Sequence, residues 1–338
     1  MPPRSTPKKV RVRVNGAAHG MFISGESPGK PILLFVHGGP GMPEYWLTRR
    51  YPFPVDELFT VVWWEQRGAG LSFEPSIRPE EMTSERSVAD TLAVSNRVRD
   101  RYDAERIYLM AHSWGSYIGL QAAARSPELY RAYIGVAQIT HQIESEALAY
   151  EYVLQRYREM GRTRMVRRLE ASPVTAATIP LPGSYDAVRD RVMHRLGVGT
   201  TRDMRSVVTG LFLPSLRSPE YTPREKVNLW RGKIFSRAAL RDEMLATDLT
   251  KRIPALRLPA YFLHGRHDYT VAYELSRAYV RQLAAPLKGF YTFDHSAHSP
   301  MFEEPDRTLR ILRDDVLRGR NDLADAEIGR AGRPGEPS

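Results

Sequence analysis

The sequence contains no cysteine, and this absence excludes disulfide bonds and thiolate catalysis anywhere in its 338 residues. It also lacks any run of about 18 or more apolar residues, so no membrane-spanning helix is predicted. The N-terminal segment MPPRSTPKKVRVRV is basic, but the apolar segment of a secretory signal peptide does not follow it. Together these absences lead us to expect a cytoplasmic protein.

The charge is unusual, because 49 Lys and Arg residues against 39 Asp and Glu residues give a formal net charge of +10. Such an excess can indicate binding to nucleic acid or to an anionic membrane. Here the arginines are spread over 97–106, 156–168, 189–205 and 217–241, and they are mixed with acidic residues. The pattern favours a solvated basic surface. We therefore expect a small-molecule or short-peptide substrate, no nucleic-acid or membrane partner, and a chain that can stand as a monomer.

Short apolar segments alternate with helical patterns along much of the chain. The segments at 32–36, 59–64, 106–111, 132–137, 260–264 and 289–293 are hydrophobic without interruption, as strands covered on both faces must be. Helices are predicted at 84–102, 115–125, 272–284 and 306–318, with Thr83 or Ser84 capping the first. The alternation predicts an α/β fold with a mostly parallel central sheet and helices on both faces. Residues 10–14 and 19–23 instead favour an antiparallel pair at the sheet edge.

The alternation stops between about 140 and 250, where the sequence is rich in Arg, Glu, Tyr and Leu and has a mostly helical pattern. We expect residues 140–250 to form a helical lid, or cap, inserted after the sixth core strand and lying over the sheet edge that binds ligands. Residues 1–139 and 251–319 would then form the core domain. The alternative is that 140–250 form a second, independent domain. The polar residues 320–338 predict a disordered tail.

The fragment AHSWG at 111–115 follows a predicted strand and leads into a predicted helix. It differs from the G-x-S-x-G nucleophile elbow only in having Ala111 for the first glycine. A strand-to-helix turn tight enough to expose a serine Oγ needs small residues on both sides of the serine. The helix that follows directs its N–H groups and dipole at a developing oxyanion. Ser113 is therefore a candidate nucleophile, and the alternative is an ordinary serine where a buried strand ends.

The segment HGGPG at 37–41 directly follows the predicted strand at 32–36. Glycine lets a backbone N–H group approach a substrate closely. An oxyanion hole needs one such donor together with the N–H of the residue after the nucleophile. Gly39 and Trp114 are our candidate donors. The alternative for a Gly/Pro cluster after a strand is a plain turn.

A serine nucleophile needs a base, and the base needs a carboxylate to orient it. In proteins with this elbow the chain order is Ser, acid, His. Asp268 follows the predicted strand at 260–264, and the next strand is followed by His295 and His298. We favour a triad of Ser113, Asp268 and His298, because His298 lies in the loop beyond the strand end.

Other acids and histidines surround these positions. Asp294 and Glu303 are rival acids, and Asp294 lies too close to the histidines in sequence to be preferred. The histidines that flank the motifs are interpreted as structural or supporting groups; they are His37, His112, His264 and His267.

Taken together, HGGPG, QRGAG with Ser72 after it, HSWGS, GRHD and AHSP resemble the motifs of the proline iminopeptidase branch of the α/β-hydrolase superfamily. The resemblance covers about 30–137 and 255–310. It implies an α/β-hydrolase fold and hydrolysis of an N-terminal residue, often proline, from a peptide, arylamide or ester. It also implies that Ser113 is acylated, that Gly39 and Trp114 hold the oxyanion, and that water activated by His298 releases the acyl group.

Two departures from this family pattern concern loops around the site. The family usually has Asp before Gln-Arg-Gly, whereas this chain has Glu65, so we expect altered packing behind the oxyanion loop. Members that cleave N-terminal proline carry a Trp-x-x-Trp-Glu segment whose carboxylate helps to hold the substrate ammonium, and this chain has none. Glu144, Glu146 and Glu151 could supply a substrate-binding carboxylate pair from one helix face; the alternative is a solvated face.

Two other functions stay open. One is an esterase, amidase or lactonase that uses the same triad with a different lid specificity. The other is a non-catalytic ligand-binding protein on a hydrolase scaffold. Ser113 argues against an epoxide hydrolase or a dehalogenase, which would need a carboxylate nucleophile there. Ser–His–Asp chemistry requires no cofactor, so we expect neither a metal nor an organic cofactor.

Overall fold

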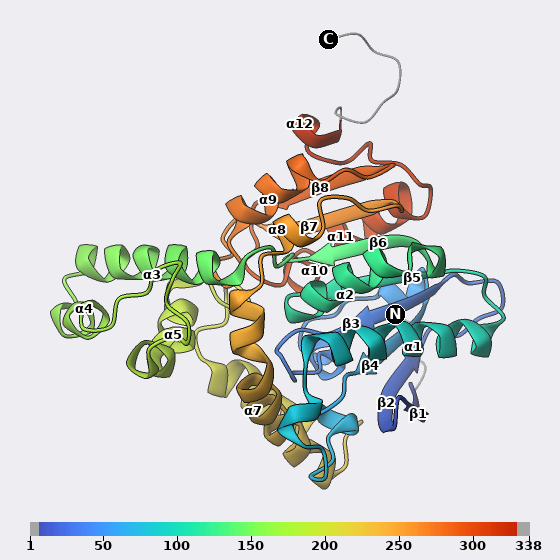
Figure 1. The fold of residues 1–338 in the computed structure, drawn as a ribbon, viewed down its shortest axis with the longest axis horizontal. Coiled ribbons are helices and arrows are strands. Elements are labelled where there is room, and N and C mark those ends of the chain that lie inside the picture. The colour runs from blue at the N-terminus through green and yellow to red at the C-terminus, as the bar shows by residue number, and fades with distance from the viewer. Residues whose placement is uncertain (1–6, 330–338) are drawn as a thin grey trace.

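The computed structural model describes residues 7–329, which contain one eight-stranded sheet in the order β1-β2-β4-β3-β5-β6-β7-β8 (Figure 1). Six strands are parallel: β3 (Ile32–Val36), β4 (Thr60–Glu65), β5 (Ile107–His112), β6 (Tyr130–Val136), β7 (Ala260–Gly265) and β8 (Lys288–Phe293). An antiparallel pair, β1 (Lys8–Val14) and β2 (Ala17–Ser24), extends one edge. The predicted α/β fold, with its mostly parallel sheet and antiparallel edge pair, is confirmed.

The strand order explains where a site can form. After β3 the chain moves outward to β4, and it then returns to the other side of β3 to form β5. Loops that leave the carboxyl ends of β3 and β5 therefore diverge, and open α/β sheets bind ligands in the crevice at such a switch point. The loops here are the HGGPG segment and the turn that contains Ser113.

Apolar side chains cover both faces of the sheet. On one face the core includes residues of α1 (Ser84–Tyr102), α2 (Trp114–Arg125) and α9 (Tyr273–Gln282). On the other it includes Trp46 and the segment formed by α10 (Pro300–Glu303), α11 (Pro305–Ile311) and a following π-helical turn (Leu312–Val316). The four predicted helices correspond to α1, α2, α9 and this last segment. The Thr83 hydroxyl caps α1 by accepting from the N–H of Arg86.

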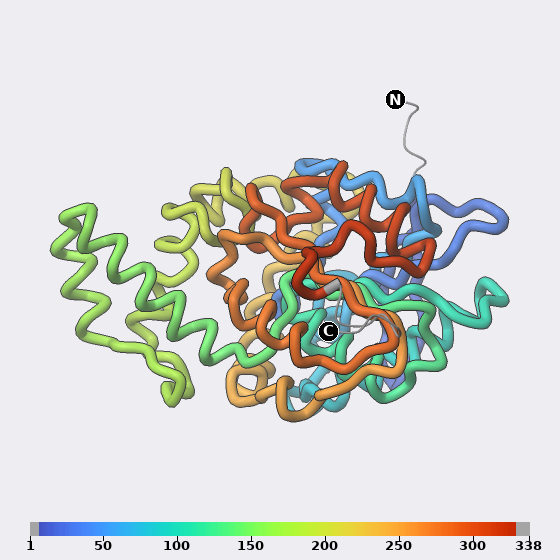
Figure 2. The backbone as a smooth tube through the Cα atoms, turned by 90° about the horizontal axis from the view of Figure 1, so that it is seen from above, coloured from blue at the N-terminus to red at the C-terminus, as the bar shows by residue number. Residues whose placement is uncertain are grey.

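Between β6 and β7 the chain is helical. Its helices are α3 (Gln142–Glu159), α4 (Thr163–Glu170), α5 (Gly183–Leu196), α6 (Leu213–Arg217), α7 (Pro223–Ala246) and α8 (Leu249–Arg252). The region from α3 to α5 projects to one side of the sheet (Figures 1 and 2) and has its own core, in which Tyr150, Leu169 and Tyr185 are buried. Helix α7 returns along the core so closely that a Cβ at Gly232 would lie 2.6 Å from the Gly68 carbonyl oxygen.

Residues 320–329 differ from the disordered tail that the sequence indicated. Asp325 donates its N–H to Phe290 O of β8, and α12 (Ala326–Gly329) buries Ile328. A buried apolar side chain and a strand-like hydrogen bond keep this polar segment ordered. The rest of the predicted tail, 330–338, lies outside the described residues.

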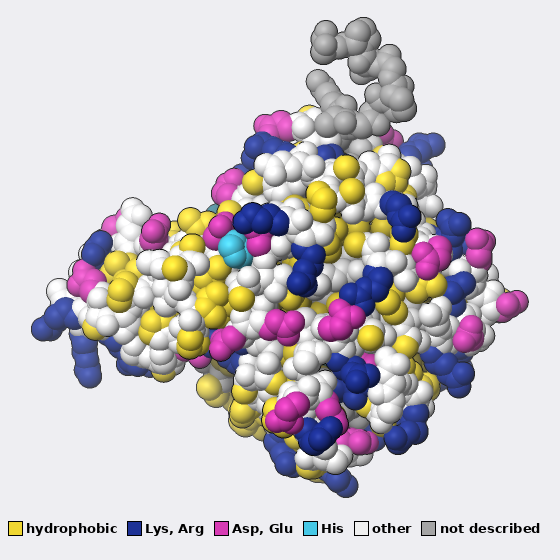
Figure 3. Space-filling model, viewed as in Figure 1, with side chains coloured by type: hydrophobic (Ala, Val, Ile, Leu, Met, Phe, Trp, Pro, Cys, Tyr) yellow, Lys and Arg dark blue, Asp and Glu magenta, His cyan; other side chains and the backbone are white. Residues whose placement is uncertain are grey.

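The surface carries its basic residues in a mixed pattern. On the face shown in Figure 3, Lys and Arg side chains are interspersed with Asp and Glu side chains. Within residues 7–329, no helix is long and apolar enough to cross a membrane.

Candidate active site

Ser113 occupies a strained turn between β5 and α2. Its φ of 55° and ψ of −123° lie outside the regions that L-residues ordinarily adopt. Two glycines make the turn possible. A Cβ at Gly115 would lie 2.1 Å from the Val36 carbonyl oxygen at the end of β3, and one at Gly119 would lie 2.7 Å from the Ala111 Cβ. Each small residue of the elbow is therefore required by a specific neighbour, and Ser113 is held at the carboxyl end of β5.

The HGGPG loop lies directly against this serine. A Cβ on Gly38 would lie 3.1 Å from the Ser113 Cβ, and Gly39, with φ of 125°, lines the same pocket as Ser113. Among the described residues, no acceptor pairs with the backbone N–H of Gly39 or with that of Trp114, the first residue of α2. Two donors are thus available beside Ser113.

Side chains behind the loop fix its position. The Trp114 indole donates to Gln66 Oε1 at 2.8 Å, and Gln66 Nε2 donates to the His37 carbonyl at 2.7 Å. His37 Nε2 in turn accepts from the Gln66 N–H at 3.1 Å. Glu65 lies one residue earlier, where its carboxyl accepts from Leu71 N–H and Tyr221 O–H. Gln66 therefore holds the HGGPG loop and the start of α2 in place. Glu65, the residue before it, also contacts the region between β6 and β7 through the Tyr221 hydroxyl.

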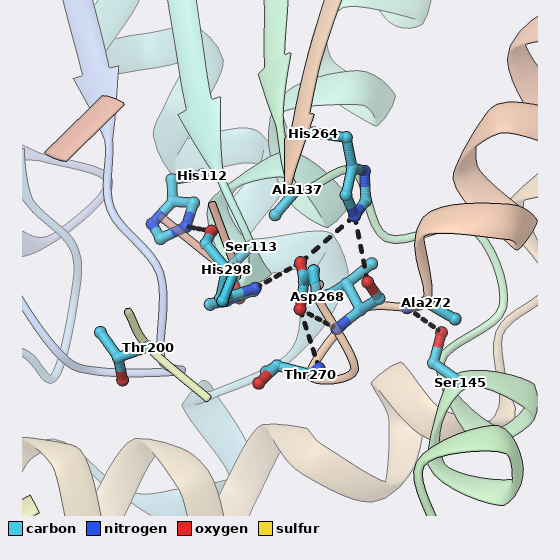
Figure 4. Close-up of polar contacts among 12 residues, drawn as sticks. His112, Ser113, Ala137, Ser145, Thr200, His264, Asp268, Thr270, Ala272 and His298 are labelled. Atoms are coloured by element: carbon cyan, nitrogen blue, oxygen red, sulfur yellow. Dashed lines mark hydrogen bonds and ion pairs between the residues drawn. The ribbon is translucent and has the colours of Figure 1, made fainter. Parts of the chain in front are cut away.

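His298 and Asp268 follow β8 and β7 and are hydrogen-bonded to each other. His298 Nδ1 lies 2.8 Å from Asp268 Oδ2, while Asp268 Oδ1 accepts from the N–H groups of Thr270 and Val271. In Figure 4 the His298 imidazole lies between Ser113 and Asp268, and Ser113 and His298 line one pocket. The structure thus brings together the three residues that the sequence favoured.

The electrostatics suit proton transfer through His298. Burial lowers the pKa of His298, against the opposing effect of Asp268, so the imidazole is neutral near pH 7 and can accept a proton. Burial alone would raise the pKa of Asp268, but His298 and His264 outweigh it and hold that pKa well below its usual range. Asp268 is therefore ionised when His298 gains charge.

The rival acids and the second histidine lie elsewhere. Asp294 is exposed and pairs with Arg266 at 2.6 Å, and His295 is exposed as well. Glu303 accepts from the Ala297 N–H at 2.8 Å, and burial raises its pKa to about 7. No hydrogen bond joins any of them to the His298 imidazole within the described residues.

The remaining histidines have structural contacts. His264 Nε2 lies 3.0 Å from the Val271 carbonyl oxygen and 3.2 Å from Asp268 Oδ2, and His267 contacts the Asp294 carbonyl. A supporting role for these two imidazoles stays a prediction.

His112 contacts two segments of the site, which its position beside Ser113 in the sequence did not indicate. Its Nδ1 lies 2.8 Å from Glu44 Oε1, and its Nε2 lies 2.9 Å from the His298 carbonyl oxygen. The same Glu44 oxygen accepts from the Gly38 N–H at 2.8 Å. Burial opposes charge on both groups, but each favours the charged form of the other, so the pKa of His112 is raised and that of Glu44 is lowered. This pair links the glycine loop, the serine turn and the histidine loop.

The three glutamates singled out in the predicted lid do not line the pocket. Glu144 is 46% exposed and pairs with His141, and Glu151 is exposed. Glu146 is buried, but both of its carboxylate oxygens accept from Arg189, at 2.6 and 2.7 Å. None of the three lines the pocket that contains Ser113, so the expected carboxylate pair is not formed there. Their spacing predicted that they share a helix, but it could not show that Glu146 pairs with Arg189 or that Glu151 is exposed.

The pocket itself has a volume of about 150 Å³. Besides Gly39, Ser113 and His298, it is lined by charged residues from the helical region that the sequence did not single out: Arg189 and Asp190 of α5, and Lys233 and Arg237 of α7. Within residues 7–329, no cluster of three or more His, Cys, Asp or Glu side chains is arranged to hold a metal ion.

Known proteins are similar to this chain in sequence and in fold. The sequence profile of the family described as "alpha/beta hydrolase fold" matches residues 31–305. The probable aminopeptidase YbaC of Bacillus subtilis (strain 168) is 32% identical over 297 residues, which cover 86% of this chain and 91% of that protein. The crystal structure of a proline iminopeptidase-related protein from Thermus thermophilus has a TM-score of 0.59 and 20% identity, covering 92% of this chain and 98% of its own. Proline iminopeptidase from Mycobacterium smegmatis has a TM-score of 0.60 and 15% identity with the same coverage.

Proposed function

The chain belongs to the α/β-hydrolase fold family, in its proline iminopeptidase-like branch, and we propose that this hydrolase releases the N-terminal residue of a peptide or arylamide through a triad of Ser113, His298 and Asp268. One observation carries the proposal. The strained turn exposes Ser113 to a pocket that also contains His298, and His298 Nδ1 lies 2.8 Å from Asp268 Oδ2. A nucleophile, a neutral base and an orienting carboxylate are the parts that acyl transfer requires.

Each residue then has a defined step. His298 Nε2 takes the proton of Ser113 as Oγ attacks the carbonyl carbon, and Asp268 stabilises the imidazolium that forms. The N–H groups of Gly39 and Trp114 donate to the oxyanion of the tetrahedral intermediate. His298 then protonates the leaving amine, and the C–N bond breaks to leave an acyl-enzyme. Water, deprotonated by His298, attacks that ester and restores Ser113.

An aminopeptidase must also hold the substrate ammonium. Asp190 is our candidate, because it lines the pocket and its side chain is 39% exposed. Burial would raise the pKa of Asp190, but Arg189, Lys233 and Arg237 outweigh it and keep the carboxylate ionised. Asp190 would take the place of the carboxylate that the resemblance to proline-cleaving family members implies and that this chain lacks together with the Trp-x-x-Trp-Glu segment.

The second candidate function is an esterase, amidase or lactonase that uses the same triad. It is favoured by the charges on the lid side of the pocket, where three cationic side chains surround the single carboxylate of Asp190. A substrate without a free ammonium would suit such surroundings.

Two measurements separate these functions. Labelling with a fluorophosphonate, followed by peptide mapping, should modify Ser113, and labelling without turnover of any substrate would favour a ligand-binding protein. A panel should then compare proline and alanine arylamides with their N-blocked forms and with short acyl esters. The proposal expects the free-amine arylamides to have the highest kcat/KM. Preference for the N-blocked compounds or the esters would overturn the aminopeptidase and leave the hydrolase.

A further inference from the structure

The lid side of the pocket is strongly charged. Arg189 and Asp190 on α5 and Lys233 and Arg237 on α7 line the same pocket as Ser113. A substrate whose carbonyl carbon reaches Ser113 therefore occupies the pocket that these side chains line. What each cation is paired with decides which of them is available to a ligand.

The Arg189 guanidinium is already paired with two protein carboxylates, those of Glu146 and Asp190. It donates to both oxygens of Glu146, at 2.6 and 2.7 Å, and to Asp190 Oδ1 at 3.0 Å. Both Arg189 and Glu146 are buried, so this bidentate pair is the strong kind of ion pair. Arg189 fixes Glu146 and Asp190 in place and has little capacity left for a ligand.

Arg237 shares its carboxylate with a second arginine. Arg237 pairs with Asp186 Oδ1, and Arg241 donates to both Asp186 oxygens, at 2.7 and 2.8 Å. One carboxylate therefore serves two guanidinium groups in this part of the helical region. The cations exceed the anions here even before Lys233 is considered.

Lys233 makes no direct ion pair with a carboxylate among the described residues, although Asp190 lies near enough to favour its charged form. Within the described residues its ammonium makes no hydrogen bond, and it lies over the Trp230 ring, whose centroid is 5.1 Å from Nζ. Burial lowers the pKa of Lys233, which reflects the cost of removing an ammonium from water. The neighbourhood then holds four cations, Lys233 with the three arginines, against three carboxylates. A partly buried, unpaired ammonium is stabilised when an anion binds to it.

We propose that Lys233 binds a carboxylate of the substrate while the scissile carbonyl lies at Ser113. This inference deepens the proposed function and rests on it. Because Lys233 and Ser113 line one pocket, the carboxylate belongs to the part of the substrate that enters this pocket together with the scissile carbon. Two kinds of substrate satisfy this: one with an acidic first residue, and a dipeptide whose free C-terminal carboxylate belongs to the leaving residue.

Two matched pairs of substrates distinguish these sources. Glutamyl and glutaminyl 4-nitroanilides differ by a carboxylate on the acyl side, and alanyl-alanine and alanyl-alaninamide differ by one on the leaving side. We expect kcat/KM to be about 10-fold higher or more for the carboxylate member of one pair, as a charge-assisted hydrogen bond provides. Equal or higher kcat/KM for the neutral member of both pairs would overturn the inference.

Variants of α7 test the role of Lys233 itself. Lys233→Met should bring the ratio within the preferred pair close to 1, and Lys233→Arg, which keeps the charge, should retain a preference. Lys226→Gln is the matched control, because Lys226 lies on the same helix but does not line the pocket, and it should leave the ratio unchanged. A ratio that survives Lys233→Met would show that Lys233 is not the carboxylate's partner.

A binding measurement covers the case in which Lys233→Met is inactive. Glutarate should slow fluorophosphonate labelling of Ser113 more than the neutral glutaramide does, and Lys233→Met should remove that difference while Ser113 is still labelled. Equal protection by the two compounds in the wild type would refute the inference. If the wild type shows neither labelling of Ser113 nor turnover, the proposed catalytic triad is refuted, and the inference about Lys233 is refuted with it. Labelling and turnover without carboxylate preference would refute the inference alone.

Discussion

Glu65 offers a quantitative test of the packing behind the glycine loop. The side chain is buried at the end of β4, where it accepts from Leu71 N–H at 2.5 Å and from Tyr221 O–H at 2.5 Å. Burial outweighs these two hydrogen bonds and raises the pKa of Glu65 from 4.5 to about 8. The folded protein therefore keeps a proton on Glu65 that the unfolded chain releases.

The sign and size of the effect follow from proton linkage. Because the pKa is raised on folding, the contribution of Glu65 to stability is full below pH 4.5 and is lost as the pH rises to about 8. In that window the free energy of unfolding falls by about 1.4 kcal/mol per pH unit through this group. Glu65→Gln cannot ionise. Its free energy of unfolding, relative to the wild type, should therefore rise by about 1.4 kcal/mol per pH unit between pH 5 and 8.

Urea unfolding of both proteins at several pH values measures this difference. Other titrating groups cancel between wild type and variant, so the slope of the difference with pH is the readout rather than its value at one pH. Glu57→Gln is the control, since it makes the same chemical change at an exposed position on a short 3₁₀ turn. A difference for Glu65→Gln that stays constant from pH 5 to 8 would refute the reasoning.

Other predictions concern the site directly. Ser113→Ala and His298→Ala should each lower kcat by about 10³-fold or more with unchanged unfolding midpoints, whereas His295→Ala should be mild; a dead His295→Ala would reassign the base. Gly115→Ala should destabilise the fold by about 3 kcal/mol or more in thermal unfolding, because its Cβ would lie 2.1 Å from a backbone oxygen. Gly183→Ala is the control, since a Cβ there meets open space, and it should not destabilise the fold. Equal destabilisation by the two substitutions would contradict the steric argument. His112→Asn should raise the pKa of the acid limb of kcat/KM, because His112 helps to lower the pKa of His298; an unshifted profile would exclude that coupling.

The parts of the site that follow strand ends could be predicted from the sequence. Ser113, Asp268 and His298 come after three apolar segments, and a parallel sheet brings the carboxyl ends of such segments to one edge. The chemistry of serine catalysis then selected among the few polar residues present there. Local pattern and general topology were sufficient for these positions.

The charged residues that α5 and α7 contribute to the pocket could not be predicted in this way. Lys233 lies on a helix whose inward face is decided by packing of α7 against the core, including the close approach at Gly232. Glu146 has the right type and spacing for a substrate ligand, yet its partner Arg189 is 43 residues away on another helix. Helical periodicity predicts which residues share a helix face, but it does not predict which residues of other helices they contact. The ion pairs of α5 and α7 could therefore be identified only from the structure.

The ordered residues 320–329 also protect the sheet. β8 is the last strand in the sheet order, so one side of its backbone has no neighbouring strand. Asp325 uses that side, since its N–H donates to Phe290 O and its carboxylate accepts from the N–H and hydroxyl of Thr292. Unpaired strand edges invite association between molecules. A chain shortened to residue 319 would expose this edge and should aggregate more readily, so an affinity tag or a fusion partner belongs after residue 329.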